Sequence, residues 1–85
     1  MRTIVIFKDD SEQARAVLDF LREFEHRTGR QLEVMDPDSR EGAGFCATYD
    51  IVEYPTMIAL DDGGQLQQMW RGPPLPTISE VSYYS

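Results

Sequence analysis

Two short runs of apolar residues place the tightest constraint on how this chain can fold. Residues 3–7 are TIVIF and residues 56–60 are TMIAL, and neither run alternates apolar with polar side chains. A strand with one face in water shows that alternation, whereas continuous runs are typical of strands covered on both faces. We therefore predict two buried strands, the first of them central, in a sheet with helices on its faces.

A helix is predicted directly after the first strand. The segment DDSEQARAVLDFLREFEHRTG places apolar residues at helical spacing, at Ala14, Val17, Leu18, Leu21 and Phe24. Asp9 or Asp10 is the expected N-cap, Asp10 and Gln13 have the spacing of a capping box, and Gly29 is the expected end of the helix. The strand that follows, over 31–35, implies a right-handed parallel crossover.

The second half of the chain predicts a helical turn, a hairpin and a short closing helix. Residues 45–52 indicate a short helix or an irregular turn, and DDGG at 61–64 is typical of a hairpin turn between 56–60 and 65–70. Leu66 and Trp70 are expected on one face of an edge strand that is otherwise rich in glutamine. Thr77 and Glu80 have the spacing of a capping box for the last helix.

The order of predicted elements and one long motif resemble the thioredoxin superfamily. The motif is ATYDIVEYPTMIALDDGGQLQQMWRG, residues 47–72, with Pro55 at the entrance of a buried strand and a glycine-containing hairpin after it. The resemblance implies an α/β protein with the minimal thioredoxin-like fold, β-α-β then β-β-α. It implies a four-stranded mixed sheet with helices on its faces, formed by one domain over 1–85. It also implies a cis peptide bond between Tyr54 and Pro55.

The sequence departs from this superfamily where thioredoxins and glutaredoxins carry Cys-x-x-Cys. The junction between the first strand and the first helix is FKDDSEQARAV, in which Ser11 or Glu12 takes the place of the nucleophile. Asp9, Asp10 and Glu12 would also raise the pKa of a thiol there, because nearby negative charge opposes thiolate formation. We therefore expect no catalytic residues and no dithiol enzyme activity.

The resemblance still implies a binding groove beside Pro55, although the dithiol is absent. It implies that the backbone of Tyr54, next to Pro55, can pair with an extended peptide or with glutathione. Phe7, Lys8 and Ser11 are the expected opposite wall of this groove. The first interpretation is therefore a non-catalytic module that binds a peptide or protein, or serves as a scaffold, through these five residues.

The alternative is a redox or glutathione-linked protein that acts through its one cysteine. Cys46 lies nine positions before Pro55, where the superfamily has no nucleophile, and a free cysteine is usually buried and structural. The residues that would bind glutathione after the fourth strand are replaced by RGPPLPT at 71–77. A third possibility is a purely structural domain or a homo-oligomer joined through its edge strands.

Composition narrows the partners and the cofactors. A net charge of −7 argues against binding to nucleic acid or to an anionic membrane, since both need clustered Lys and Arg residues, so a partner should be neutral or basic. No apolar run is long enough to span a bilayer. With one cysteine and one histidine, His26, we expect no intramolecular disulfide, no metal site and no cofactor. We also expect a cytoplasmic location and a monomer or weak homo-oligomer.

Overall fold

A four-stranded mixed sheet with three helices forms the structure, a computed structural model that describes all residues from 1 to 85. The elements in chain order are β1 (Arg2–Ile6), α1 (Ala14–Thr28), β2 (Glu33–Met35), α2 (Arg40–Tyr49), β3 (Thr56–Leu60), β4 (Leu66–Arg71) and α3 (Ile78–Tyr84). The strand order is β2-β1-β3-β4, in which β2 runs parallel to β1 while β3 and β4 are antiparallel to their neighbours. This order confirms that the first strand is central and the fourth lies at an edge.

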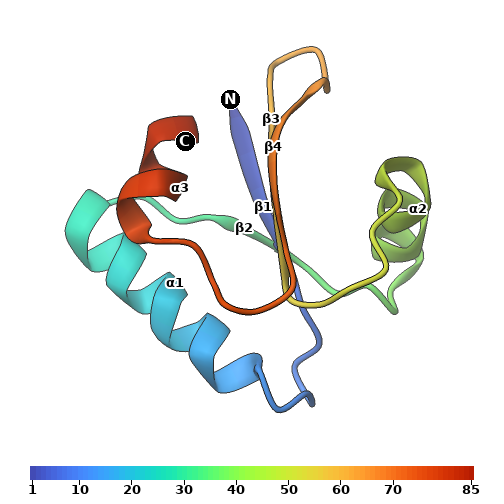
Figure 1. Cartoon of the computed structure of the whole chain (residues 1–85), viewed down its shortest axis with the longest axis horizontal. Coiled ribbons are helices and arrows are strands. Elements are labelled where there is room, and N and C mark those ends of the chain that lie inside the picture. The colour runs from blue at the N-terminus through green and yellow to red at the C-terminus, as the bar shows by residue number, and fades with distance from the viewer.

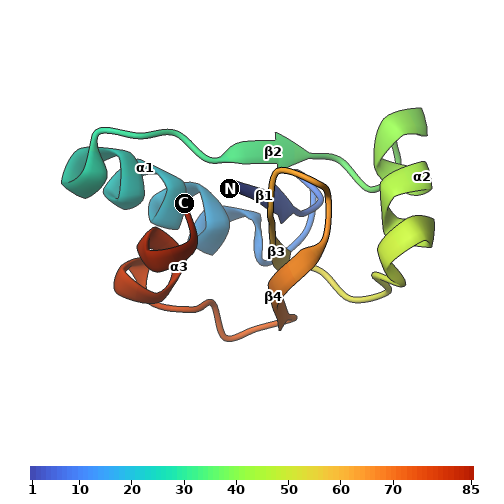
Figure 2. The same cartoon turned by 90° about the horizontal axis from the view of Figure 1, so that it is seen from above.

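Helices cover both faces of the sheet, as the two apolar runs predict. Figures 1 and 2 show α1 and α3 together on one side of the strands and α2 on the other. Alternate residues of β1 divide between the two layers: Val5 packs toward α1 and α3, whereas Ile4 and Ile6 pack in the cluster that includes Cys46 of α2. None of these β1 side chains is accessible to solvent, and burial of each contributes about 1.5–3 kcal/mol. None of the three helices has the length and apolar composition to cross a membrane.

Helix α1 begins later than the sequence predicts. The expected caps, Asp9 and Asp10, lie in a turn, and Gln13 takes the N-cap position without a side-chain hydrogen bond. The reason is local: the backbone N–H and the hydroxyl of Ser11 both donate to the carbonyl of Lys8, which closes a turn before the helix can start. The predicted end is confirmed, because Gly29 adopts a φ of 73° and its N–H donates to the carbonyl of Glu25.

Helix α2 is a full helix that starts at Arg40, earlier than the helical turn expected from the sequence. Ser39 is its N-cap, and the Ser39 hydroxyl accepts the N–H of Gly42 at 2.9 Å. The carbonyl of Asp36 accepts hydrogen bonds from both the N–H and the hydroxyl of Ser39, so this carbonyl is held against the first turn of α2. At Gly42 a Cβ atom would overlap the Asp36 carbonyl oxygen. The close approach therefore requires glycine at this position.

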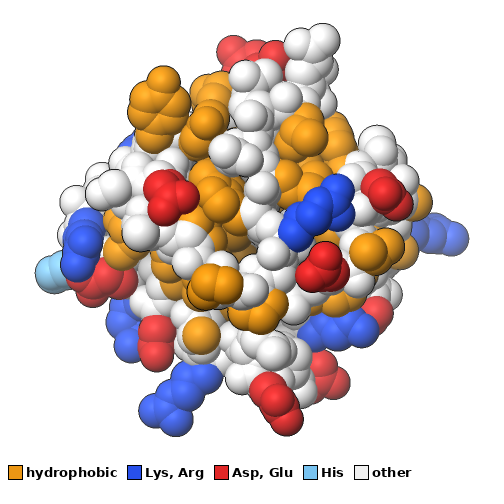
Figure 3. Space-filling view, in the orientation of Figure 1, with side chains coloured by type: hydrophobic (Ala, Val, Ile, Leu, Met, Phe, Trp, Pro, Cys, Tyr) orange, Lys and Arg blue, Asp and Glu red, His pale blue; other side chains and the backbone are white.

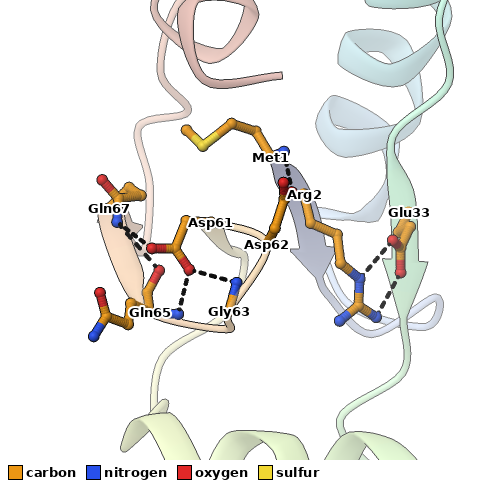
Figure 4. Close-up of polar contacts among 8 residues, drawn as sticks. All are labelled: Met1, Arg2, Glu33, Asp61, Asp62, Gly63, Gln65 and Gln67. Carbon is orange, nitrogen blue, oxygen red and sulfur yellow. Dashed lines mark hydrogen bonds and ion pairs between the residues drawn. The ribbon is translucent and has the colours of Figure 1, made fainter.

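The hairpin between β3 and β4 is confirmed, and one carboxylate organises it. Asp61 Oδ1 accepts the N–H groups of Gly63 and Gln65, each at 2.9 Å, and Gln67 Nε2 donates to the other oxygen (Figure 4). The pairing of β3 with β4 shifts register between Ala59 and Leu60. This hairpin lies at the end of the sheet where the chain starts, so the amino group of Met1 reaches Asp62.

The register shift corrects the predicted orientation of β4. Leu66 and Trp70 do not share a face: Trp70 is opposite Met57 and packs toward α1 and α3, whereas Leu66 is opposite Leu60, in the cluster on the other side. The physical reason is that one extra residue in β4, Gln67, reverses the alternation of side chains. The ring of Trp70 contacts Tyr84 of α3 edge to face, at 5.6 Å between centroids.

The open edge of β4 carries both apolar and polar side chains. Met69 and Trp70 are half-buried, and Leu66 is about half exposed. Hydrophobic side chains gather over the middle of the molecular face that this edge occupies (Figure 3). The N–H of Met69 donates to the side-chain oxygen of its neighbour Gln68 at 2.9 Å.

The predicted capping box of α3 is confirmed, with Thr77 and Glu80 each bonded to the other's backbone.

Candidate functional site

One end of the sheet collects the residues that the sequence singles out for binding. Ile6 at the end of β1 pairs with Met35 at the end of β2 and with Thr56 at the start of β3, and Thr56 pairs with Arg71 at the end of β4. The segments 7–12, 36–38, 53–55 and 72–74 therefore meet at this end, which is the lower end of the sheet in Figure 1. We call it the proline end, because the Tyr54–Pro55 and Pro73–Pro74 peptide bonds there are both cis.

The five predicted groove residues do not all reach the surface. Phe7 and Pro55 are buried, and Phe7 belongs to the cluster beneath α1 and α3. Lys8, Ser11 and Tyr54 are half-buried, and Tyr54 packs against the cluster on the α2 side of the sheet. The ammonium of Lys8 sits over the Tyr54 ring at 5.5 Å from the centroid, and Ser11 is tied to the carbonyl of Lys8. Lys8, Ser11 and Tyr54 are defined from here on as the Tyr54 surface.

Two residues, Asp38 and Cys46, lie beside the Tyr54 surface and are not placed there by the sequence reasoning, which considers Cys46 only as a separate redox candidate. Asp38 Oδ2 lies 3.7 Å from Lys8 Nζ, so the Lys8 ammonium is shared between a carboxylate and an aromatic ring. Cys46 of α2 lies beside the Tyr54 side chain, which packs against the cluster that contains it. The available signal is topological: Asp38 follows the strand parallel to β1, and the loop after that strand must pass the same end of the sheet.

The surroundings of Tyr54 change its acidity. Burial raises the pKa of the Tyr54 phenol, and the neighbouring Cys46 thiol and Asp38 carboxylate raise it further. The neutral phenol is therefore the form that the folded protein favours. A charged phenolate would be poorly solvated in this position, so Tyr54 serves as a packing residue that also offers a hydroxyl group.

We predict that Tyr54 titrates above its ordinary pKa of 10.0 and that Asp38→Asn lowers the value only part of the way, because burial is the largest cause. Since the folded pKa is raised, the associated stability is present below pH 10 and is lost as the pH rises through the folded pKa. The measurement is an NMR titration of the tyrosine ring carbons. A Tyr54 pKa at or below 10 would contradict the described packing.

The backbone of Tyr54 is free of hydrogen bonds within the chain. Neither its N–H nor its C=O is paired, although Thr56 begins the β3 ladder two residues later. Buried backbone groups are nearly always paired, so we expect this unpaired N–H and C=O to face solvent. Val52 adds an apolar side chain that is 73% exposed, two residues earlier in the same irregular segment. The arrangement offers one donor, one acceptor and one apolar contact to an extended chain.

The thiol of Cys46 is the one cysteine thiol of the chain, and it lies in α2, away from the start of α1. Residues 9–13, which connect β1 to α1, contain no sulfur, and the hydroxyl of Ser11 donates to the carbonyl of Lys8. Cys46 is a free thiol, only 7% exposed, and it packs with Ile4, Ile6 and Ile51. No group of three or more His, Cys, Asp or Glu side chains is arranged to hold a metal ion.

Both cavities of the structure lie away from the Tyr54 surface. One, of about 370 Å³, is at the opposite end of the sheet, where Arg2, Thr3 and Arg30 line it. The other, of about 300 Å³, lies beside the open edge of β2, against Leu21 of α1 and Val34. Neither is lined by Phe7, Lys8, Ser11, Tyr54 or Pro55. The Tyr54 surface thus belongs to neither cavity, and an open surface suits a segment of chain better than an enclosed small molecule.

Comparison with known proteins agrees with this architecture. No protein-family model and no curated protein sequence matches the chain. Among solved structures, the chain is similar to thioredoxin 1 from the thermophilic eubacterium Thermosipho africanus, with a TM-score of 0.68 and 21% sequence identity. The match covers 99% of this chain and 89% of that thioredoxin. The chain therefore has a thioredoxin-like fold, on a sequence whose single cysteine cannot form the Cys-x-x-Cys pair.

Proposed function

We propose that this protein is a non-catalytic, cytoplasmic binding module that takes up an extended peptide segment at the Tyr54 surface. The observation that carries the proposal is the unpaired N–H and C=O of Tyr54, placed at the entrance of a buried strand. An extended chain that pairs with these two groups gains main-chain hydrogen bonds, as in other modes of strand addition. Val52 supplies an adjacent apolar contact.

The test uses a neutral probe, a short capped peptide that alternates valine with glutamine. We expect it to shift the NMR amide signals of Tyr54 and Lys8 and to slow hydrogen exchange at the Tyr54 N–H. The same peptide with N-methyl groups at alternate residues has lost the donors that would reach the Tyr54 carbonyl, so it should cause no such shifts. Equal shifts with both peptides, or shifts confined to the open edge of β4, would refute the proposal.

A matched pair of variants locates the contact. Val52 and Val34 are both exposed valines, at 73% and 52%, but Val34 lies on β2, away from the Tyr54 surface. Val52→Ser should weaken the affinity for the valine–glutamine peptide, because it removes the apolar contact beside Tyr54. Val34→Ser should leave that affinity unchanged. The reverse pattern would move the binding site to the β2 edge.

An insulin-reduction assay distinguishes the proposed function from a redox role through Cys46. Because Cys46 is buried and lacks a second thiol, the protein should not reduce insulin disulfides with dithiothreitol as electron donor, beyond the rate of dithiothreitol alone. Cys46→Ser should leave that background rate unchanged. Turnover of insulin that disappears in Cys46→Ser would exclude the non-catalytic interpretation.

A further inference from the structure

The charges of the protein are divided unevenly between the two ends of its sheet. The segments at the proline end carry the carboxylates Asp9, Asp10, Glu12, Asp36, Asp38 and Glu53, against the cation Lys8 and, at the adjoining end of β4, Arg71. At the opposite end the amino group of Met1 pairs with Asp62, and Arg2 pairs with Glu33. The excess negative charge of the chain is therefore concentrated beside the Tyr54 surface.

The carboxylates next to the Tyr54 surface are free to act on a partner. Asp9, Asp10, Glu12 and Glu53 are all exposed, and none of them forms an ion pair within the chain. The one lysine present is already engaged, because Lys8 lies between Asp38 and the Tyr54 ring. Asp9 and Asp10 directly follow Lys8, and Glu53 directly precedes Tyr54. An extended chain paired with Tyr54 would therefore pass the two segments that carry these carboxylates.

We propose that the partner of the Tyr54 surface is an extended peptide segment in which lysine or arginine residues flank an apolar residue. The inference rests on the proposed function and adds the chemistry of its ligand. The apolar residue contacts Val52, the peptide backbone pairs with Tyr54, and the basic side chains reach Asp9, Asp10 and Glu53. Charge complementarity of this kind raises the association rate and selects against acidic chains.

The experiment compares three capped peptides of one length and one pattern, in which valine alternates with lysine, glutamine or glutamate. At low ionic strength we expect the lysine peptide to bind most tightly and the glutamate peptide least, with about tenfold or more between them, because several exposed charge pairs add. The difference should shrink at high salt, since exposed charges are screened. Isothermal titration calorimetry on the full chain measures all three affinities.

Charge variants test which carboxylates are responsible. Asp9→Asn combined with Asp10→Asn should lower the affinity for the lysine peptide by about three- to tenfold. The affinity for the glutamine peptide should stay unchanged. Asp62→Asn removes one negative charge, against two in the double variant, and lies at the opposite end of the sheet, so it should not change the affinity for the lysine peptide. If Asp62→Asn had half the effect of the double variant in free energy, in proportion to the charge removed, only net charge would matter and the proposal would be overturned.

The outcomes separate this inference from the proposed function. If the three peptides bind equally and all shift the Tyr54 signals, the charge preference is wrong and the binding module stands. If none of the three binds, the proposed function itself fails and the inference fails with it. If the lysine peptide binds most tightly but shifts signals away from Tyr54 and Lys8, the acidic residues serve another surface and the proposal is overturned.

Discussion

Replacing Gly42 by alanine is expected to destabilise the protein by about 2–3 kcal/mol, the range of severe overpacking. A Cβ atom at this position would overlap the carbonyl oxygen and carbon of Asp36 and crowd the hydroxyl of Ser39. The two Asp36 atoms are backbone and cannot move aside as the end of a flexible side chain can. Either α2 shifts away from the loop after β2 or the hydrogen bonds of Ser39 to Asp36 break.

Gly44 provides the matched control in the same helix. A Cβ atom at Gly44 would meet nothing within 4 Å, so Gly44→Ala should stabilise the protein by about 0.5–1 kcal/mol through helix propensity alone. Urea unfolding of the two variants measures both changes. The described position of α2 would be wrong if Gly42→Ala were as stable as Gly44→Ala. Since α2 carries Cys46 beside Tyr54, Gly42→Ala should also shift the NMR signals of the Tyr54 ring.

The second large effect is expected at Phe24. Its side chain is fully buried in the cluster beneath α1 and α3, where it packs with Val5, Met57 and Val81. Phe24→Ala should cost about 3–5 kcal/mol, the transfer free energy of the ring together with the cavity it leaves. Since a domain of this size has a total stability of about 5–15 kcal/mol, much of the protein should unfold at modest urea concentrations.

The comparison for Phe24 is Phe20, one turn earlier on α1. The two rings stack at 6.3 Å between centroids, but Phe20 is only half-buried. Phe20→Ala should therefore cost about 1–2 kcal/mol, in proportion to the smaller area removed from water. Urea midpoints of the two variants check the ranking. If Phe20→Ala costs as much as Phe24→Ala, the core does not lie where the structure places it.

The strands are predictable because their signal is local. The runs TIVIF and TMIAL predict buried strands from their own residues, without reference to the segments around them. Thr77 and Glu80 likewise predict the start of a helix within four residues. The start of α1 is not predictable in the same way. Asp9 and Asp10 are good caps by residue type, but Ser11 bonds back to Lys8 and closes a turn first.

Features that depend on pairing between distant segments cannot be predicted from the local sequence pattern. The register shift in β4 reverses Leu66 relative to Trp70, and nothing in QLQQMW indicates it. The same holds for the site. Tyr54 and Lys8 are predicted on one surface from the resemblance, whereas Asp38 joins them only because β2 pairs in parallel with β1. Cys46 joins because α2 packs where it does.

The hydrogen bond between Gln68 and Met69 has a consequence for solubility. An unpaired strand edge is a template on which a second molecule can add a strand and begin aggregation. The inner side of β4 is filled by the β3 backbone, so the Met69 N–H that Gln68 accepts lies on the open side. Gln68 therefore occupies a donor that an incoming strand would need, and the extra residue Gln67 disturbs the register beside it. We therefore expect both features to disfavour the addition of a strand at the open edge of β4.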